Sequence, residues 1–232
     1  LNIPTYVSGM ARGLLSESEM PIYRHARKKA LQEADGVILA GVACDFRLDY
    51  GRNINHKAKI ISINLSRKDL YKNRKPQKAI IGSSSKFLIS LSKKYSGNRW
   101  ENWHKTLLNR DHQRIETILT ESRKKTEFIN PLKICTAINE HTKKGDIIIA
   151  DGGDFVATAS YIIRPCSLGG WLDPGVFGTL GVGAGFILGS YLSKMLPIFC
   201  TFTLMNMKFC NKTYVFLFIL LIYILIFLSG ER

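Results

Sequence analysis

The chain has 232 residues, a length that allows one or two domains. Its formal net charge is +15. Its basic runs at 24–29, 67–78 and 123–125 lack interleaved aromatic residues, so we expect solvated helix faces, attractive to a phosphate-rich ligand such as CoA, and no nucleic-acid site. The five cysteines contain no C-x-x-C pair and leave one unmatched, so the sequence signals neither a zinc site nor a disulfide framework. We expect them to be small core residues in a reducing compartment.

The first 95 residues alternate between strand and helix patterns. Strands are expected at 1–7, 36–41, 59–64 and 79–82, a turn at 9–13, and helices at 21–34 and 83–95, the last capped by Ser83. This alternation is typical of α/β proteins with a parallel, doubly wound sheet.

A polar, charged connector follows over residues 96–130. An apolar stripe predicts that part of it is a surface helix; the stripe consists of Trp100, Trp103, Leu107 and Leu108. A second helix is expected over 131–141, with Leu132, Cys135 and Ile138 facing inward.

A strand, a glycine turn and a helix then follow in immediate succession. The apolar run 146–150 predicts a fully buried parallel strand, 151–154 a sharp turn, and 155–163 a helix that ends at Arg164-Pro165. After a loop at 171–175, a glycine-rich helix is expected to begin within 177–185. A strand end beside a helix N-terminus is a site for an anion such as a diphosphate.

Two blocks of this region carry a family resemblance. Asp151–Val156 (DGGDFV) and Trp171–Phe186 (WLDPGVFGTLGVGAGF) resemble thiamine-diphosphate enzymes of the acetolactate synthase and 2-hydroxyacyl-CoA lyase group. Members of this group have three domains, and residue 1 is Leu, so we expect a piece of a longer protein. The resemblance implies two incomplete, doubly wound (Rossmann-like) units: residues 1–95 are the later part of the central domain, and 131–196 begin the diphosphate-binding domain.

The resemblance also assigns residues to the cofactor's diphosphate. Asp151 and Gly152 form the turn, and Gly153, Asp154 and Phe155 stand where relatives present groups to the diphosphate. Because a carboxylate repels a diphosphate, we expect backbone N–H contacts to dominate, with Asp154 capping the helix.

Three further residues are assigned to the cofactor's rings. Leu180, the catalytic candidate, is the bulky residue that enforces the bent cofactor shape, the Gly178 carbonyl accepts a hydrogen bond from the aminopyrimidine, and Thr179 lines the turn. Core packing at a helix start explains Leu180 equally well from sequence alone. The family's activating Glu comes from a partner subunit, and neither Glu127 nor Glu140 lies in a comparable motif.

Other ligands of the family are not matched here. Relatives continue with a further strand, a Gly-Asp-Gly and an Asn that bind Mg²⁺, and none of these follows Pro197, so we expect no metal ligands in this chain and an unpaired sheet edge. The segment 41–47 keeps the G-x-x-x-D-x-R pattern of flavin-binding relatives. Asn64 and Ser83 stand where those relatives have acidic residues, so we expect no tight FAD binding.

Residues 197–232 differ from the family text. The uncharged run 214–230 is about 25 Å long as a helix, the short limit for a membrane span, so we expect a hydrophobic C-terminal helix and a membrane location, in the endoplasmic reticulum by resemblance. The alternative is translated intron or a mis-joined gene model.

The expected function is a thiamine-diphosphate- and Mg²⁺-dependent lyase that cleaves a 2-hydroxyacyl-CoA to an aldehyde and formyl-CoA. This chain is expected to be a truncated, inactive form of a homodimeric or homotetrameric enzyme. An acetolactate synthase-type transferase acting on pyruvate, a 2-oxo acid, and a non-catalytic membrane-tethered fragment are the alternatives.

Overall fold

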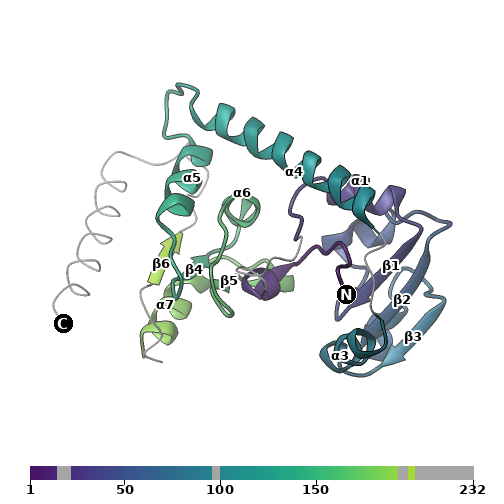
Figure 1. The fold of residues 1–232 in the computed structure, drawn as a ribbon. Coiled ribbons are helices and arrows are strands. Elements are labelled where there is room, and N and C mark those ends of the chain that lie inside the picture. Colours follow the sequence, from purple (N-terminus) through teal and green to yellow (C-terminus); the bar gives the residue numbers. More distant parts are fainter. Residues whose placement is uncertain (15–21, 96–99, 193–197, 202–232) are drawn as a thin grey trace. The chain divides into compact units, whose positions relative to one another are not determined.

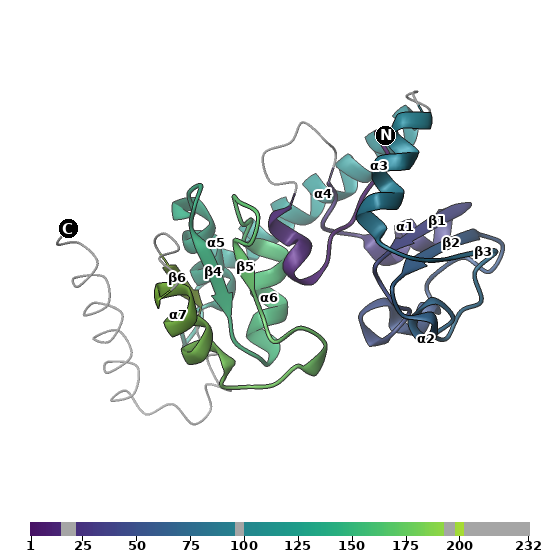
Figure 2. The same ribbon diagram turned by 90° about the horizontal axis from the view of Figure 1, so that it is seen from below.

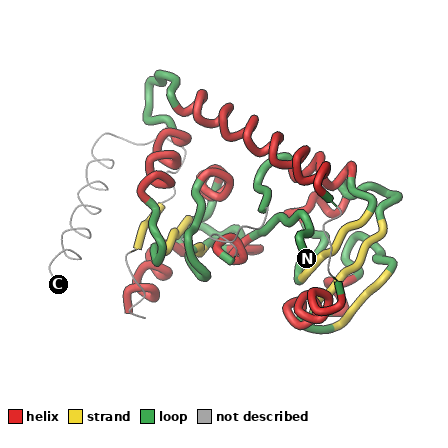
Figure 3. Tube along the Cα trace, in the orientation of Figure 1, coloured by secondary structure: helices red, strands yellow, loops and turns green. Residues whose placement is uncertain are grey.

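The computed structural model describes residues 1–14, 22–95, 100–192 and 198–201. The chain divides into two compact units, the first comprising Leu1–Tyr6 and Met20–Ile115, and the second Val7–Glu19 and Glu116–Arg232. The division falls within α4 (Glu101–Ser122), one continuous helix in Figure 3. The sequence-based division keeps residues 1–95 together, whereas the short 3₁₀ helix at Gly9–Gly13 clusters with the second unit.

The first unit is built on a three-stranded parallel sheet. Its strands β1 (Gly36–Ala40), β2 (Lys59–Asn64) and β3 (Lys78–Ile81) are hydrogen-bonded in that order (Figure 1). Ile60 and Ile63 of the middle strand are buried. These strands confirm the three predicted between residues 36 and 82, because continuous apolar runs suit strands covered on both faces.

Short helices flank and connect these strands. α1 (Arg27–Glu33) precedes β1, a 3₁₀ segment at Phe46–Gly51 lies between β1 and β2, α2 (Arg67–Leu70) lies between β2 and β3, and α3 (Ser84–Lys94) follows β3. Figure 2 shows α3 along one side of the sheet. The Ser83 hydroxyl accepts a hydrogen bond from the Lys86 N–H at 3.4 Å, so the predicted serine cap is confirmed.

Two predictions for the first 34 residues are wrong. Residues 1–7 form no strand beyond a single bridge between Thr5 and Ile22. The helix predicted from residue 21 begins only at Arg27, because the buried Asp111 carboxylate accepts the backbone N–H groups of Arg24 and His25 at 2.9 and 3.0 Å. Those N–H groups therefore face a side chain rather than a preceding turn of helix.

The predicted connector helix is longer than expected and its stripe is partly wrong. Leu107 is buried against Tyr23 and Ala30, with Trp103 packed beside them, whereas Leu108 is 49% exposed. Adjacent helical residues point about 100° apart, so both leucines cannot face one core. Trp100 precedes the helix and packs on Tyr95.

The second unit contains a second parallel sheet with β4 (Ile147–Ala150) between β5 (Trp171–Leu172) and β6 (Ile198–Thr201). Its helices are α5 (Pro131–His141), α6 (Asp154–Ile162) and α7 (Val182–Leu192). Cys135 of α5, Ile148 of β4 and Ala159 of α6 are fully buried in one core cluster. The predicted helix 131–141 is confirmed, with Leu132 and Ile138 packed against that cluster.

The expected unpaired edge of this sheet is wrong on the side of β6. Residues Ile198–Thr201 pair in parallel with Ile147–Ala150, so β4 has a hydrogen-bonded neighbour on each side. The physical reason is local, since the β-branched residues at both ends of this segment favour a strand conformation.

The expected hydrophobic C-terminal helix at 214–230 lies outside the described residues. Within the ranges that the structure describes, no helix combines the length and apolar character needed to cross a membrane.

Candidate functional site

The turn after β4 brings the chain from a fully buried strand to the start of α6. All four residues of β4 are buried, as are Asp151 and Gly152, whereas Gly153 is exposed. Gly153 is the N-cap of α6 with φ 89°, a left-handed conformation that favours glycine. No side chain caps this helix. Its first N–H groups therefore lack the usual side-chain acceptor at the carboxyl end of β4.

Asp154 does not cap α6 as predicted. It is the first residue of the helix, and Gly153 occupies the cap position because the turn needs a positive φ there. The Asp154 side chain is in the first helical turn, where a carboxylate interacts favourably with the helix dipole. Phe155 is buried in the core cluster around β4, so its backbone rather than its ring is available to a ligand.

A series of turns precedes α7, and the helix then begins within the predicted range of 177–185. A 3₁₀ turn spans Gly175–Phe177, Gly178 has φ 59°, Gly181 has φ 87°, and α7 starts only at Val182. Positive φ at two glycines is incompatible with continuous helix, so the helix begins later than residue 177. Phe177 is 83% and Leu180 is 55% exposed, which leaves two large apolar side chains beside these turns.

The two glycine-rich stretches meet at the carboxyl end of β4. A methyl group added to Gly152 would collide with the Thr179 carbonyl oxygen and would lie 2.9 Å from Leu180 Cδ2. The Asp151 carboxylate accepts the backbone N–H of Gly181 at 2.9 Å and of Val182 at 3.1 Å. The structure thus brings Asp151 and Gly152 together with Thr179 and Leu180, although the stretches are almost 30 residues apart.

An anchor for the 171–175 loop was missed by the sequence analysis. The Asp173 carboxylate accepts the Trp171 indole N–H at 2.8 Å and the Gly175 backbone N–H at 2.8 Å. It also forms an ion pair with Arg12 at 3.6 Å. The Arg12 guanidinium lies over the buried Trp171 ring. A side chain on Gly13 would collide with the Ser167 carbonyl. The only available signal was an arginine beside a glycine in an otherwise apolar turn.

At the carboxyl ends of the strands in the first sheet, polar side chains bond to groups in their own turns. Asp45 and Arg47 form a close ion pair at 2.7 Å, whose hydrogen bonds hold the pKa of Asp45 below its usual value despite burial. Asn64 accepts the Ser66 N–H at 3.0 Å, and Ser83 caps α3. The pattern residues of this edge therefore stabilise their own turns. In the described part of the chain, no three His, Cys, Asp or Glu side chains form a group suited to a metal ion.

Comparisons with known proteins show which family this chain resembles. Residues 1–91 match the family model described as the central domain of thiamine pyrophosphate enzymes. Over 84% of this chain, 2-hydroxyacyl-CoA lyase 2 from Xenopus laevis is 47% identical and that from Danio rerio is 44% identical. This chain belongs to the thiamine-diphosphate-dependent enzyme family.

Other members of the thiamine-diphosphate family are more distant. The acetolactate synthase large subunit IlvG of Mycobacterium tuberculosis is 28% identical over 83% of the chain. The chain spans about a third of the length of its curated relatives, 32% for the two animal lyases and 35% for the synthase. The resemblance seen in the two glycine-rich blocks is thereby confirmed at the level of the family.

Proposed function

We propose that this chain is part of a thiamine-diphosphate- and Mg²⁺-dependent lyase that cleaves a 2-hydroxyacyl-CoA to an aldehyde and formyl-CoA. Residues 1–95 are the later part of its central domain, and 131–196 begin its diphosphate-binding domain. The observation that carries the proposal is the close approach of Gly152 to Thr179 and Leu180 at the carboxyl end of β4. Open α/β sheets bind their ligands at this edge.

The residues present fit a diphosphate at the start of α6. The N–H groups of Gly153, Asp154 and Phe155 would hold it, since α6 has no side-chain cap and Gly152 adds no Cβ to the turn. When bound, thiamine diphosphate supplies the electron sink for breaking the bond next to the hydroxyl-bearing carbon.

The residues before α7 fit the cofactor's rings. Leu180 would support the bent cofactor and exclude water, and the Gly178 carbonyl and Thr179 would receive the aminopyrimidine. The exposed side chain of Leu180, beside the Gly152 turn, supports this role. We place the magnesium ligands outside this chain, because no Gly-Asp-Gly follows Pro197. The chain alone is then inactive.

Two alternatives rest on specific observations. An acetolactate synthase-type transferase acting on pyruvate is supported by the similarity to the mycobacterial synthase. A non-catalytic, membrane-tethered fragment is supported by the apolar run at 214–230. By family resemblance the proposed location is the membrane of the endoplasmic reticulum, with the cytoplasm as the alternative. In the full-length protein we expect a homodimer or homotetramer, and no tight FAD binding.

Enzyme assays separate the lyase from the transferase. With thiamine diphosphate and Mg²⁺, the longer protein should release formyl-CoA from a 2-hydroxyacyl-CoA, and Leu180→Ala should lower kcat by at least about tenfold. Leu188→Ala, an exposed leucine of α7, is the matched control and should leave kcat unchanged. Acetolactate formation from pyruvate without formyl-CoA release would establish the transferase instead.

Calorimetry tests the role of this chain by itself. Titration of the purified chain in detergent with thiamine diphosphate and Mg²⁺ should give no micromolar binding, since hydrogen bonds to charged groups contribute about 1.5–3 kcal/mol each and several are missing. Micromolar, Mg²⁺-dependent binding would show that the metal ligands lie within the chain. A transcript that continues past Pro197 into Gly-Asp-Gly would exclude the membrane-tethered fragment.

A further inference from the structure

One carboxylate oxygen receives the N–H groups of two segments at the end of β4. Asp151 Oδ1 accepts the N–H of Gly152 at 2.7 Å, of Gly181 at 2.9 Å and of Val182 at 3.1 Å. The second oxygen, Oδ2, lies 3.1 Å from the same Gly181 nitrogen. Asp151 is only 9% exposed, so its charge is compensated by these backbone donors rather than by solvent.

Asp151 acts as a cap for a helix that begins 31 residues later. The residues before α7 are Gly178, Thr179, Leu180 and Gly181, in which Thr179 has the only side-chain hydrogen-bonding group. A carboxylate at the N-terminus of α7 satisfies otherwise unpaired N–H groups and interacts favourably with the helix dipole. Gly183 leaves room for it, because a Cβ there would lie 3.3 Å from Asp151 Oδ2.

These contacts place Leu180 between two fixed points. Its neighbour Gly181 is bonded to the Asp151 carboxylate, and the Thr179 carbonyl lies against Gly152. Leu180 Cδ2 is 2.9 Å from the position that a Gly152 Cβ would occupy. A shift of Gly181 away from β4 would therefore also move Leu180 away from the Gly152 turn.

We propose that Asp151 is a positioning residue that sets the place of Leu180 through Gly181 and Val182, and that its carboxylate is not a cofactor ligand. This role rests on the proposed function of Leu180. It changes the assignment of Asp151 made from the sequence, where the residue belonged to the diphosphate turn.

Nuclear magnetic resonance of the whole chain in detergent tests this without any cofactor. Labelling with ¹⁵N-glycine, ¹⁵N-valine and ¹³C-methyl leucine gives the exchange rates of the Gly181 and Val182 amides. It also gives the NOE between the Leu180 methyl groups and the Gly152 α-protons. Asp151→Ala should speed exchange of both amides by at least about tenfold and abolish the NOE.

Asp151→Asn is the second variant, to be used if Asp151→Ala does not fold. Three N–H groups converge on Oδ1, so the amide oxygen should take that place and the amide nitrogen the place of Oδ2. Exchange should then rise at Gly181, which loses one of its two acceptors, while Val182 exchange and the NOE are retained.

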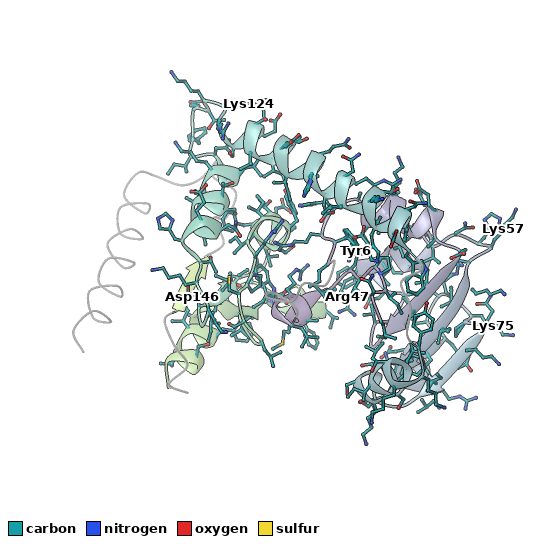
Figure 4. All side chains as sticks on the ribbon, in the orientation of Figure 1. Tyr6, Arg47, Lys57, Lys75, Lys124 and Asp146 are labelled. Atoms are coloured by element: carbon teal, nitrogen blue, oxygen red, sulfur yellow. The ribbon has the colours of Figure 1, made fainter. Side chains whose placement is uncertain are left out.

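Asp146→Asn is the matched control at the opposite end of the same strand (Asp146 is labelled in Figure 4). Asp146 is 3% exposed and likewise accepts a backbone N–H, that of Lys143 at 2.7 Å. This variant should leave the Leu180 NOE and the Gly181 and Val182 exchange rates unchanged. An equal loss in Asp146→Asn, unchanged exchange in Asp151→Ala, or unchanged Gly181 exchange in Asp151→Asn would overturn the proposal. Absence of cofactor binding would count only against the proposed function.

Discussion

The carboxyl ends of the two parallel sheets use the same kinds of residue for different purposes. After β1, the Asp45 carboxylate pairs with Arg47, two residues away. More distant side chains donate to backbone carbonyls of the same turn, from Asn73 to Cys44 and from Arg27 to Arg47. After β4, Asp151 reaches Gly181 and Val182, and the turn is closed against a segment almost 30 residues later. The acidic residue thus has a local partner at the first edge and remote partners at the second.

The two edges depend on glycine for different reasons. Gly41, at the end of β1, has φ 73°, a left-handed conformation that favours glycine, and a Cβ added there would lie 3.3 Å from the Ser84 hydroxyl, which can rotate. Gly152 faces the Thr179 carbonyl, which cannot move without moving the backbone. A side chain can rotate to make room for an added methyl group, whereas two backbones in contact cannot separate so easily.

The largest effect is therefore expected at Gly152. Gly152→Ala places a methyl group against the Thr179 carbonyl and should destabilise the second unit by about 1–3 kcal/mol, as overpacking generally does. Chemical denaturation followed by the fluorescence of Trp171, with Trp100 and Trp103 replaced by Phe, reports on this unit.

Gly185→Ala is the control for this substitution. Gly185 lies in α7 with nothing within 4 Å of an added Cβ, so alanine should stabilise the helix by about 0.5–1 kcal/mol. The two variants thus have opposite expected signs. Equal stability of Gly152→Ala and the unsubstituted chain would contradict the backbone contact.

The next effect concerns the local pair of the first unit. Asp45→Asn should destabilise that unit by about 1–2 kcal/mol at neutral pH, a figure reduced because Arg47 is about a third exposed. Circular dichroism during urea unfolding measures it. Asp49→Asn, which removes an exposed ion pair with Arg52 at 3.6 Å, should change stability by less than about 0.5 kcal/mol.

The same pair predicts a direction of pH dependence. The hydrogen bonds from Arg47 depress the pKa of Asp45 in the folded chain, so its contribution is present above the unfolded pKa of about 3.9. That contribution is lost as the pH falls through the folded pKa. The stability difference between the unsubstituted chain and Asp45→Asn should therefore shrink below about pH 4, and a difference that grows there would contradict the pair.

A smaller effect is expected at the cap of α3. Ser83→Ala removes the hydroxyl that accepts the Lys86 N–H at 3.4 Å in an exposed position, so the loss should be near 0.5 kcal/mol, the low end for N-caps. Ser90→Ala, in the same helix and also exposed, lacks a cap role and should be neutral or slightly stabilising. Urea unfolding of both variants tests whether this edge uses Ser83 mainly as a cap.

The last prediction is a negative one: the first unit should not retain FAD. Asn64 and Ser83 already bond to neighbouring backbone N–H groups and supply no carboxylate for ribose hydroxyls. The chain incubated with FAD and desalted should show no flavin absorbance. Stoichiometric retention of flavin would mean that the first edge binds ligands as well as closing its own turns.

Local patterns determined much of this protein. Continuous apolar runs specified β1, β2 and β4, because parallel strands are covered on both faces. The Ser83 cap specified the start of α3, and Asn130 with Pro131 marks the start of α5. The two glycine-rich blocks identified the family.

Only the tertiary structure decided the outcome where a distant group competes with a local preference. α1 begins at Arg27 because Asp111, more than 80 residues away, takes the preceding N–H groups. α7 begins at Val182 because two glycines adopt positive φ and Asp151 caps the helix from across the sheet edge. Arg12 packs on Trp171, a partner that the residues of its own turn do not identify. Hydrogen bonds and packing between remote segments depend on three-dimensional proximity, which residue spacing along the chain does not encode.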